Sequence, residues 1–195
     1  MVYRAYYNSI QQSIVQRYLA MIREPDIKHA PIISNLLVEE LLRTEIIPLL
    51  PDGLHISKGE VVNGKIISGD CDLIIYRKPI IYQYGPIVIV PRENAKAIID
   101  IEIHGEKFLK AFHQDTHASE RISNKKKDIE SLKKFADKIF CLGLHAHAKT
   151  KEFELWMKNR HSNENHIFIL YTRHNKQIID GEFERLIKEI QKLTL

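Results

Sequence analysis

The spacing of apolar residues changes along the chain, and each change marks the border of a predicted element. In the first segment an apolar stripe repeats every three or four residues and consists of Tyr7, Ile10, Ile14, Tyr18 and Met21. This is the period of an amphipathic helix. It predicts a helix over residues 5–24, which Pro25 brings to an end.

A second helical segment follows over residues 31–47 and opens with Pro31, a residue suited to the first helical turn. We expect its buried side to consist of Ile33, Leu36, Leu37 and Leu41. Pro48 and Pro51 close the segment, and Asp52-Gly53 has the composition of a turn.

Apolar runs with a period of two then predict strands. The candidates are His55–Val62, Cys71–Arg77, Ile87–Val90 and Ala95–His104, with Asn63-Gly64 as a hairpin signal after the first. The last candidate alternates strictly, because Ile99, Ile101 and Ile103 share one face. Asp100, Glu102 and His104 share the other face.

The second half of the chain mixes both periods. It predicts helices over residues 106–120, 123–138, 149–159 and 181–193, and strands over residues 139–145 and 166–173. This order of helices and strands is typical of an α/β fold with a central mixed sheet flanked by helices. Since no internal repeat or linker interrupts the chain, we expect residues 1–195 to form a single domain.

Composition narrows the class of protein without identifying it. The chain has 195 residues, 44% apolar and 28% charged, which excludes a disordered or collagen-like chain. Two cysteines are too few for a disulfide framework, and no run of 18 apolar residues is present to span a membrane. The N-terminal residues lack the apolar core of a signal peptide. We therefore expect a cytoplasmic protein that does not enter a membrane.

The net charge of +4 is a mild excess, and its distribution says more than its size. Six basic residues crowd into 14 positions: Arg121, Lys125, Lys126, Lys127, Lys133 and Lys134. Two interpretations remain open at this point. The cluster is either a solvated helix face or a patch that contacts the phosphates of a nucleic acid.

Carboxylates on apolar strands are the feature that points to chemistry. Asp100 and Glu102 project side by side from a strand too apolar to be an edge strand, and Asp70 and Asp72 repeat the spacing at the start of another. Buried unpaired carboxylates repel one another and are costly, and a divalent cation relieves both problems. Acids at the ends of two strands would supply the oxygen ligands that Mg²⁺ prefers. The alternative is that this face of the sheet is simply solvated.

These residues resemble the PD-(D/E)XK nuclease superfamily, and within it the branch that includes the NucC-type endonucleases of cyclic-oligonucleotide antiphage defence. His29 opens a helix that carries Glu39, and Ser68-Gly69-Asp70-Cys71-Asp72 is similar to the S-x-Q-x-D strand of the family. Ile89-Val90-Pro91-Arg92-Glu93 and the strand ending in Asp100-Ile101-Glu102 follow, where the family has I-V-P-x-E and E-x-K. The resemblance covers about residues 29–110 and implies a restriction-endonuclease-like fold.

The resemblance assigns roles to single positions. Asp72 stands at the metal-binding aspartate, Asp100 at the acid of E-x-K, and Glu39 at an additional acid on the first helix, with Glu40 as the alternative. The chain departs from the pattern at two positions: Glu102 replaces the catalytic lysine, and Asp70 replaces the glutamine. Asp72, Asp100 and Glu102 are thus the expected catalytic residues, and Asp70, Asp72, Asp100, Glu102 and Glu39 the expected metal ligands.

The implied activity is a Mg²⁺-dependent DNA endonuclease, either restriction-type or an antiphage-defence effector, in which Mn²⁺ also supports cleavage. Lys107 or Lys110 are candidates to replace the missing lysine, and His104 to orient water or contact phosphate. DNA contacts are expected from Lys107, Lys110, Arg121, Lys125, Lys126 and Lys127. Because cutting both strands of a duplex needs two sites, a homo-oligomer is expected, with a dimer as the first expectation.

Competing hypotheses remain open on the sequence alone. A nuclease-fold module that binds nucleic acid or a partner protein without cutting is the alternative, because Glu102 cannot supply positive charge. An RNA nuclease would use the same residues. His113 and His117 have the spacing of a zinc pair but lack the adjacent glutamate, so an exposed polar face is the simpler interpretation. His145 and His147 are either a nucleic-acid contact, a metal pair or surface residues, and Phe153 and Trp156 are most simply core residues.

Overall fold

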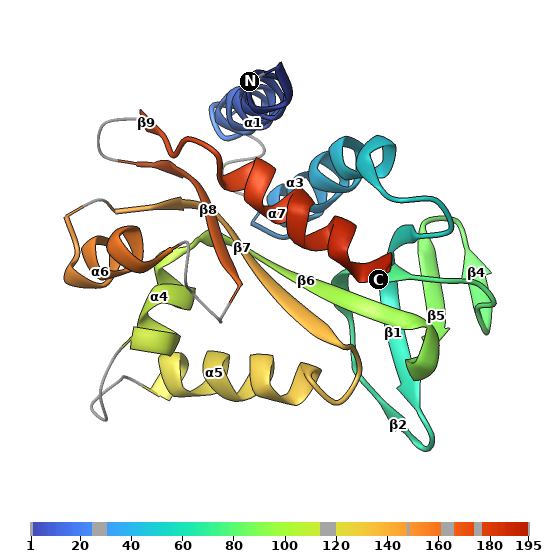
Figure 1. Ribbon diagram of the computed structural model, residues 1–195. Coiled ribbons are helices and arrows are strands. Elements are labelled where there is room, and N and C mark those ends of the chain that lie inside the picture. Colours follow the sequence, from blue (N-terminus) through green and yellow to red (C-terminus); the bar gives the residue numbers. More distant parts are fainter. Residues whose placement is uncertain are drawn as a thin grey trace.

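A computed structural model describes residues 2–24, 31–113, 120–147, 149–160, 166–173 and 177–194 (Figure 1). Its helices are α1 (Val2–Met21), α3 (Pro31–Ile46), α4 (Glu106–His113), α5 (Glu120–Leu132), α6 (Lys151–Asn159) and α7 (Glu182–Gln191). The strands are β1 (His55–Asn63), β2 (Ile66–Ile67), β3 (Cys71–Tyr76), β4 (Tyr82–Tyr84), β5 (Ile87–Pro91), β6 (Ala95–His104), β7 (Lys138–Ala146), β8 (Ile167–Thr172) and β9 (Gln177–Ile178).

All nine of these strands join one sheet in the order β4-β5-β1-β3-β6-β7-β8-β9, with β2 paired to β1. The sheet is mixed, because β1, β3 and β6 pair antiparallel whereas β6, β7 and β8 pair parallel. Strands β3 and β6 lie in its interior, as their apolar sequences predicted. The predicted hairpin after β1 is confirmed: Asn63 pairs with Ile66, and Gly64 takes the positive φ of 62° that the turn needs.

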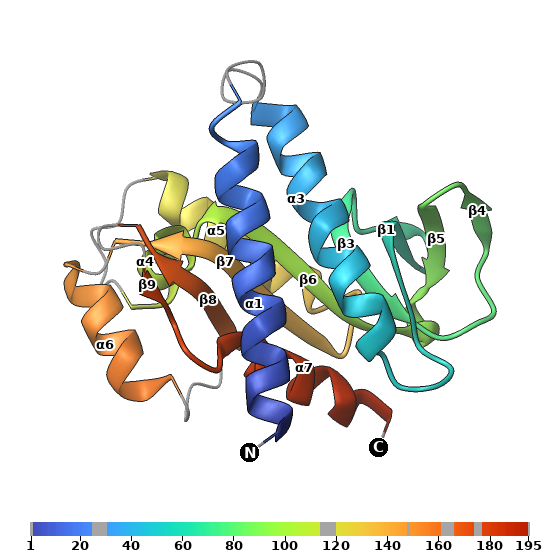
Figure 2. The same cartoon turned by 90° about the horizontal axis from the view of Figure 1, so that it is seen from above.

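Helices cover both faces of the sheet (Figures 1 and 2). One layer is formed by α1, α3 and α7, and the other by α4, α5 and α6. Alternate residues of β6 supply the two cores, since Ile99 packs in the first and Ile98 in the second. Phe153 and Trp156 of α6 are core residues of the second, as expected. Within the described ranges no helix is both long and apolar enough to cross a membrane.

The predicted buried side of α3 is only partly right. Leu41 is buried, but Ile33, Leu36 and Leu37 are 52%, 47% and 38% exposed. The face turned to the sheet instead carries Val38, Leu42 and Ile46, each fully buried. Because the helix is apolar on more than one side, both sets have a helical spacing, and only packing against β1 and β3 selects between them.

Two predicted helix borders are wrong or fall outside the description. The helix predicted over residues 123–138 ends at Leu132, where the amide of Phe135 donates to the Leu132 carbonyl in a tight turn. Burial of Phe135 and Ala136 drives this turn, because it brings them under the sheet before β7 begins. The helix predicted over residues 106–120 is observed as α4, and residues 114–119 lie outside the described part of the chain.

Gln11 anchors the first helix to the last elements of the chain. Its buried side-chain nitrogen donates to the carbonyls of Leu170 and Ile179 at 2.7 and 2.8 Å, and its side-chain oxygen accepts from the Phe183 amide at 3.0 Å. All three backbone groups lie between β8 and the start of α7. A single buried amide therefore satisfies polar groups that packing would otherwise leave without partners.

We expect Gln11→Ala to lower the free energy of unfolding by about 2 to 4 kcal/mol, because it leaves several buried polar groups unpaired. Gln12→Ala is the matched control, since Gln12 is exposed on the same helix, and it should change stability by less than about 0.5 kcal/mol. Urea unfolding followed by circular dichroism measures both. Equal stability of the two variants would contradict the anchoring role.

Candidate active site

The predicted catalytic aspartates meet where β3 and β6 separate. The last register pair at this end is Leu73 with Ile99, and β6 continues beyond it. The amide of Ile101 then donates to the Asp72 carboxylate at 2.7 Å. The divergence of two interior strands thus turns Asp72 toward β6, next to Asp100.

Lys125 lies between the two acids of β6. Its ammonium group is 2.9 Å from the Asp100 carboxylate and 2.9 Å from that of Glu102. It also lies 5.1 Å from the centre of the Phe108 ring, a favourable cation–π distance. All three charged side chains are largely buried, with 13% to 18% of each exposed. Helix α5 therefore supplies a positive charge beside Glu102, the position at which the sequence lacks the expected lysine.

A second lysine, Lys58, pairs with the acids on the opposite side of the sheet. The Lys58 ammonium group on β1 is 2.8 Å from the Glu39 carboxylate of α3 and 3.5 Å from that of Asp70. Glu39 is buried, whereas the Asp70 side chain is 69% exposed. Glu39 and Asp70, expected as metal ligands, therefore share one ammonium group beside Asp72.

Burial and neighbouring charges shift the pKa values of the acids in different directions. Burial raises the pKa of Asp72 to about 7, although the Ile101 amide opposes it, and it also raises the pKa of Asp100 against the pull of Lys125. Burial acts on Glu102 too, but hydrogen bonds from Lys107 and Lys125 outweigh it and lower the pKa. Among Asp72, Asp100 and Glu102, only Glu102 therefore has its pKa lowered.

The donor set fits a hard divalent cation in its chemistry but not as a preformed cage. Carboxylate oxygens of Asp72, Asp100 and Glu102 are the ligands that Mg²⁺ prefers. Yet no three His, Cys, Asp or Glu side chains among the described residues converge tightly enough to hold a metal ion. Lys125 occupies the space between Asp100 and Glu102, so a metal ion would have to displace its ammonium group.

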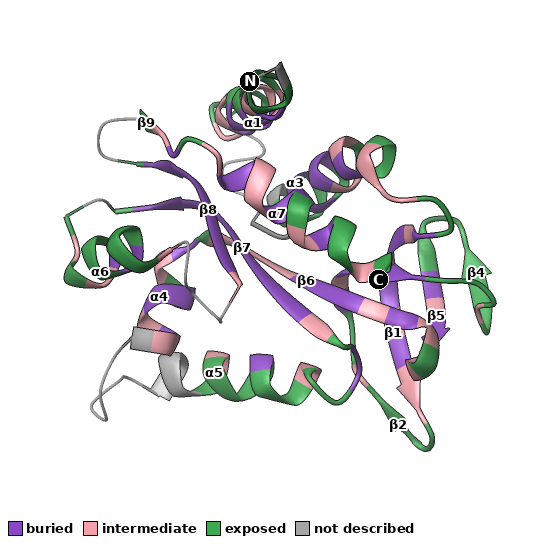
Figure 3. Ribbon diagram, in the orientation of Figure 1, coloured by how far each residue is buried: buried purple, intermediate pink, exposed green. Residues whose placement is uncertain are grey.

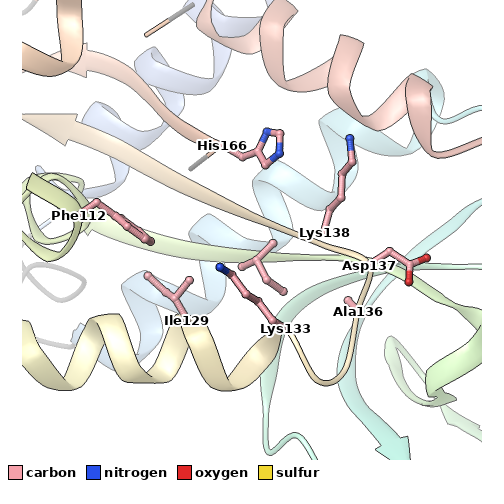
Figure 4. A pocket seen from close by; sticks show the side chains of 8 residues that line it. Phe112, Ile129, Lys133, Ala136, Asp137, Lys138 and His166 are labelled. Carbon is pink, nitrogen blue, oxygen red and sulfur yellow. The ribbon is translucent and has the colours of Figure 1, made fainter. Parts of the chain in front are cut away.

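The space beside Asp72 is small. A cleft of about 30 Å³ is lined by Asn35, Val38, Glu39, Asp72, Ile101 and Ile103. A separate cavity of about 270 Å³ lies at the far end of α5 and the start of β7 and is lined by Lys133, Lys138 and His166 among others (Figure 4). None of the acids of the candidate site borders that second cavity. The acids of the candidate site thus lie together at the sheet and not in a deep pocket.

The structure sorts the other predicted residues. Glu40 is exposed and bound to Arg43 at 2.7 Å, so Glu39 and not Glu40 faces the site. Lys107 is 2.6 Å from Glu102, and Lys110 is half-buried on α4. Lys126 and Lys127 are exposed on α5. Arg121 belongs to α5, but its side chain lies outside the described part of the structure.

The histidines divide into one buried residue, His145, with the exposed His104 beside it, and separate surface residues. His104 Nδ1 is 3.1 Å from Nε2 of His145, which is 3% exposed, and 3.7 Å from the Glu106 carboxylate. His147 is exposed and does not join them. The zinc hypothesis for His113 and His117 falls on side chains outside those described, as does the predicted helix start at His29.

Sequence reasoning missed Lys58 and the inward orientation of Lys125. Lys58 carried a weak signal, because it shares a strand face with the buried Ile56. A lysine on an apolar strand face predicts a buried acidic partner. Lys125 gave no such signal, because its neighbours Lys126 and Lys127 make the whole segment appear to be a solvated basic face.

Comparison with known proteins identifies the fold of this chain. No family model matches the chain, and no curated protein matches it in sequence. It is similar to NucC of P. aeruginosa ATCC27853 in its cAAA-bound form, with a TM-score of 0.64 and 13% identity over 96% of this chain and 90% of that one. NucC of E. coli MS115-1 in its cAAA-bound form gives a TM-score of 0.65 and 12% identity over 96% and 89%.

The apo form of the E. coli MS115-1 protein is similar at a TM-score of 0.51, with 12% identity over 92% of this chain and 90% of that one. The expected restriction-endonuclease-like α/β fold is therefore confirmed, as the fold of NucC.

We expect His145 to make the protein less stable as pH falls from about 6.5 to 4. Burial lowers the pKa of His145 to about 4, so in this range the unfolded chain binds a proton that the folded protein does not. The free energy of unfolding attributable to this group then drops by up to about 3 kcal/mol. His145→Gln should flatten the pH dependence measured by urea unfolding. His147→Gln, at an exposed position, removes only the smallest of the charges that lower the pKa of His145, so it should change the pH dependence far less.

Proposed function

We propose that this chain is a metal-dependent nuclease that hydrolyses phosphodiester bonds of DNA. The observation that carries the proposal is the group of Asp72, Asp100 and Glu102 with the Lys125 ammonium group among them. Lys125 supplies, from a helix, the positive charge that the strand motif lacks at Glu102. The shared fold with NucC supports the same reaction class by analogy.

Each residue has a part in the proposed reaction. Asp72 and Asp100, with Glu102 or Glu39, would hold Mg²⁺ or Mn²⁺, which polarises the phosphate and lowers the pKa of water when bound. Lys125 offsets the charge of the phosphate at the opened site. Glu102 is kept ionised by Lys107 and Lys125, so it is available as an anionic ligand for the cation. Lys58 offsets part of the negative charge of Glu39 and Asp70, so the phosphate meets less repulsion beside Asp72.

DNA is the proposed substrate, and Lys126 and Lys127 are placed to contact its backbone. Both are exposed on α5 directly after Lys125. Such phosphate contacts position a duplex without reading its sequence. We further propose a homo-oligomer, because two strands need two sites, and a role in restriction or antiphage defence. Since two of the similar NucC structures are cAAA-bound forms, cAAA is included in the assay below.

One observation favours a second candidate function. Every acid of the site already has a cationic or amide partner: Lys58 for Glu39, Ile101 for Asp72, and Lys125 for Asp100 and Glu102. Such a site is stable without a metal ion. A nuclease-fold module that binds nucleic acid without cutting it would look the same.

Cleavage of supercoiled plasmid separates the two candidates. We expect wild-type protein to cut with Mg²⁺ or Mn²⁺, with or without cAAA, and not with EDTA. Asp72→Asn should lower the rate by at least about a thousandfold, because it removes a charged ligand of the proposed metal ion. Lys125→Met should lower it by about a hundredfold or more, because it removes a positive charge at the phosphate. Lys188→Met is the control, because Lys188 is 61% exposed on α7 and pairs with Glu184, and it should reduce cutting by less than about threefold.

Calorimetric titration with Mn²⁺ completes the test. A wild type that neither binds Mn²⁺ nor cuts any plasmid, but still binds DNA, would establish the non-cutting module instead. Full activity of Lys125→Met would remove Lys125 from the mechanism while leaving the nuclease assignment intact.

A further inference from the structure

The outer edge of the sheet carries a group of exposed apolar side chains. Strands β4 and β5 form a hairpin beyond α3, and Figures 2 and 3 show it uncovered by any described helix. Tyr84 is 75% exposed, Tyr82 and Ile81 are each 57% exposed, and Ile87 is 49% exposed. An apolar patch of this kind on a protein surface marks a binding site more often than chance.

Strand register puts Tyr82, Tyr84 and Ile87 on one face. Tyr84 pairs with Ile87, and Ile87 pairs with Lys58 of β1, so the three residues form one row across three strands. Tyr82 pairs with Ile89 in the next row. The opposite face is core at β5, where Val88 is fully buried, whereas its partner Gln83 of β4 is exposed on that face. The two tyrosines therefore project from the open face only.

This row leads directly into the candidate active site. Lys58, at its inner end, lies 2.8 Å from the Glu39 carboxylate. A cleft of about 120 Å³ lies between α3 and the hairpin turn and is lined by Leu36, Glu39, Glu40, Lys58 and Pro86, among others. Pro86 belongs to the turn that connects Tyr84 to Ile87. The tyrosine face thus borders the Lys58–Glu39 side of the candidate site.

We propose that this face, which we call the tyrosine platform (Tyr82, Tyr84 and Ile87), stacks the bases of unpaired nucleotides next to the phosphate that is cut. This inference rests on the proposed nuclease function and names the form of its substrate. Aromatic side chains bind single-stranded nucleic acid by stacking on bases, independently of their sequence.

The spacing of the tyrosines favours an unpaired strand over a duplex. Residues two apart on a strand are separated by about 6.8 Å. Neighbouring bases in a duplex are stacked about 3.4 Å apart, and their faces are covered by one another. Two tyrosines at double that spacing each take one base only from an extended, unstacked strand.

The platform is less suited to a second copy of the chain. Strand β4, at the outer edge, has three residues, which is short for addition of a further strand. Its largest side chains are tyrosines, whose hydroxyl groups keep the face compatible with water. Self-association through this face is retained below as an outcome that would overturn the proposal.

Binding of fluorescent oligonucleotides in EDTA tests the platform without cleavage. We expect the double variant Tyr82→Ala/Tyr84→Ala to bind a single-stranded 12-mer at least about tenfold more weakly than wild type, since each stacked base contributes substantially to affinity. Binding of the matching blunt duplex should change by less than about twofold. Tyr82→Phe/Tyr84→Phe retains the rings and should bind the single strand like wild type.

Tyr3→Ala/Tyr6→Ala is the matched control, because these tyrosines of α1 are 77% and 51% exposed and lie outside the hairpin. Its single-strand affinity should equal that of wild type. Thermal melting should show that all variants are folded, because the substituted rings are exposed. In plasmid assays with Mg²⁺, a gapped duplex should be cut faster than an intact one by wild type and not by the alanine variant.

The outcomes separate the inference from the proposed function. If wild type cuts DNA but the alanine variant binds the single strand equally well, the platform is overturned and the nuclease assignment stands. If wild type neither binds nor cuts DNA, both fail. If light scattering shows that only the alanine variant loses an oligomer, the face is a self-association surface and the stacking role is overturned.

Discussion

The structure depends on how three carboxylates are kept beside one another on interior strands of a sheet. Asp72 and Asp100 lie on β3 and β6, which are covered on both faces, and their desolvation would be prohibitive without partners. These carboxylates therefore require charged partners, and the Lys125 ammonium group between Asp100 and Glu102 is the partner of two of them. It also fixes where α5 must lie, because the lysine has to come from the helix packed on that face.

The same requirement is met a second time from the other side of the sheet. Lys58 projects from β1 toward α3 and holds Glu39 and Asp70. Because β1 pairs with both β3 and β5, this one strand connects the acidic site to the exposed hairpin at the edge. The position of Lys58 in the sheet therefore links the chemistry of the site to the surface proposed to hold its substrate.

Two lysines in the site have opposite consequences for function. They stabilise the acids in the absence of a metal ion, and they also stand where a divalent cation would bind, so metal binding and ion pairing compete for the same oxygens. A site built this way would open as its ligands arrive, since phosphate offers the ammonium groups a new partner as a cation takes their place. Under the proposed function, the balance between the two sets of contacts would decide whether the site cuts or only binds.

The sequence by itself determined β1, β3, β5, β6, β7 and β8, the acidic pair of β6 and the α/β order of elements, because local periodicity specifies them. The short strands β2, β4 and β9 were not predicted, since two or three residues carry no period. Asp100 and Glu102 had to share a face once β6 was a strand. The sequence did not determine which side of α3 is buried, where α5 ends, or that Lys125 faces inward while Lys126 and Lys127 face water. Those features depend on contacts between segments far apart in the chain. Only the tertiary structure shows that Lys125 and Lys58 lie beside the acids, because a lysine's partner is set by packing and not by its neighbours in sequence.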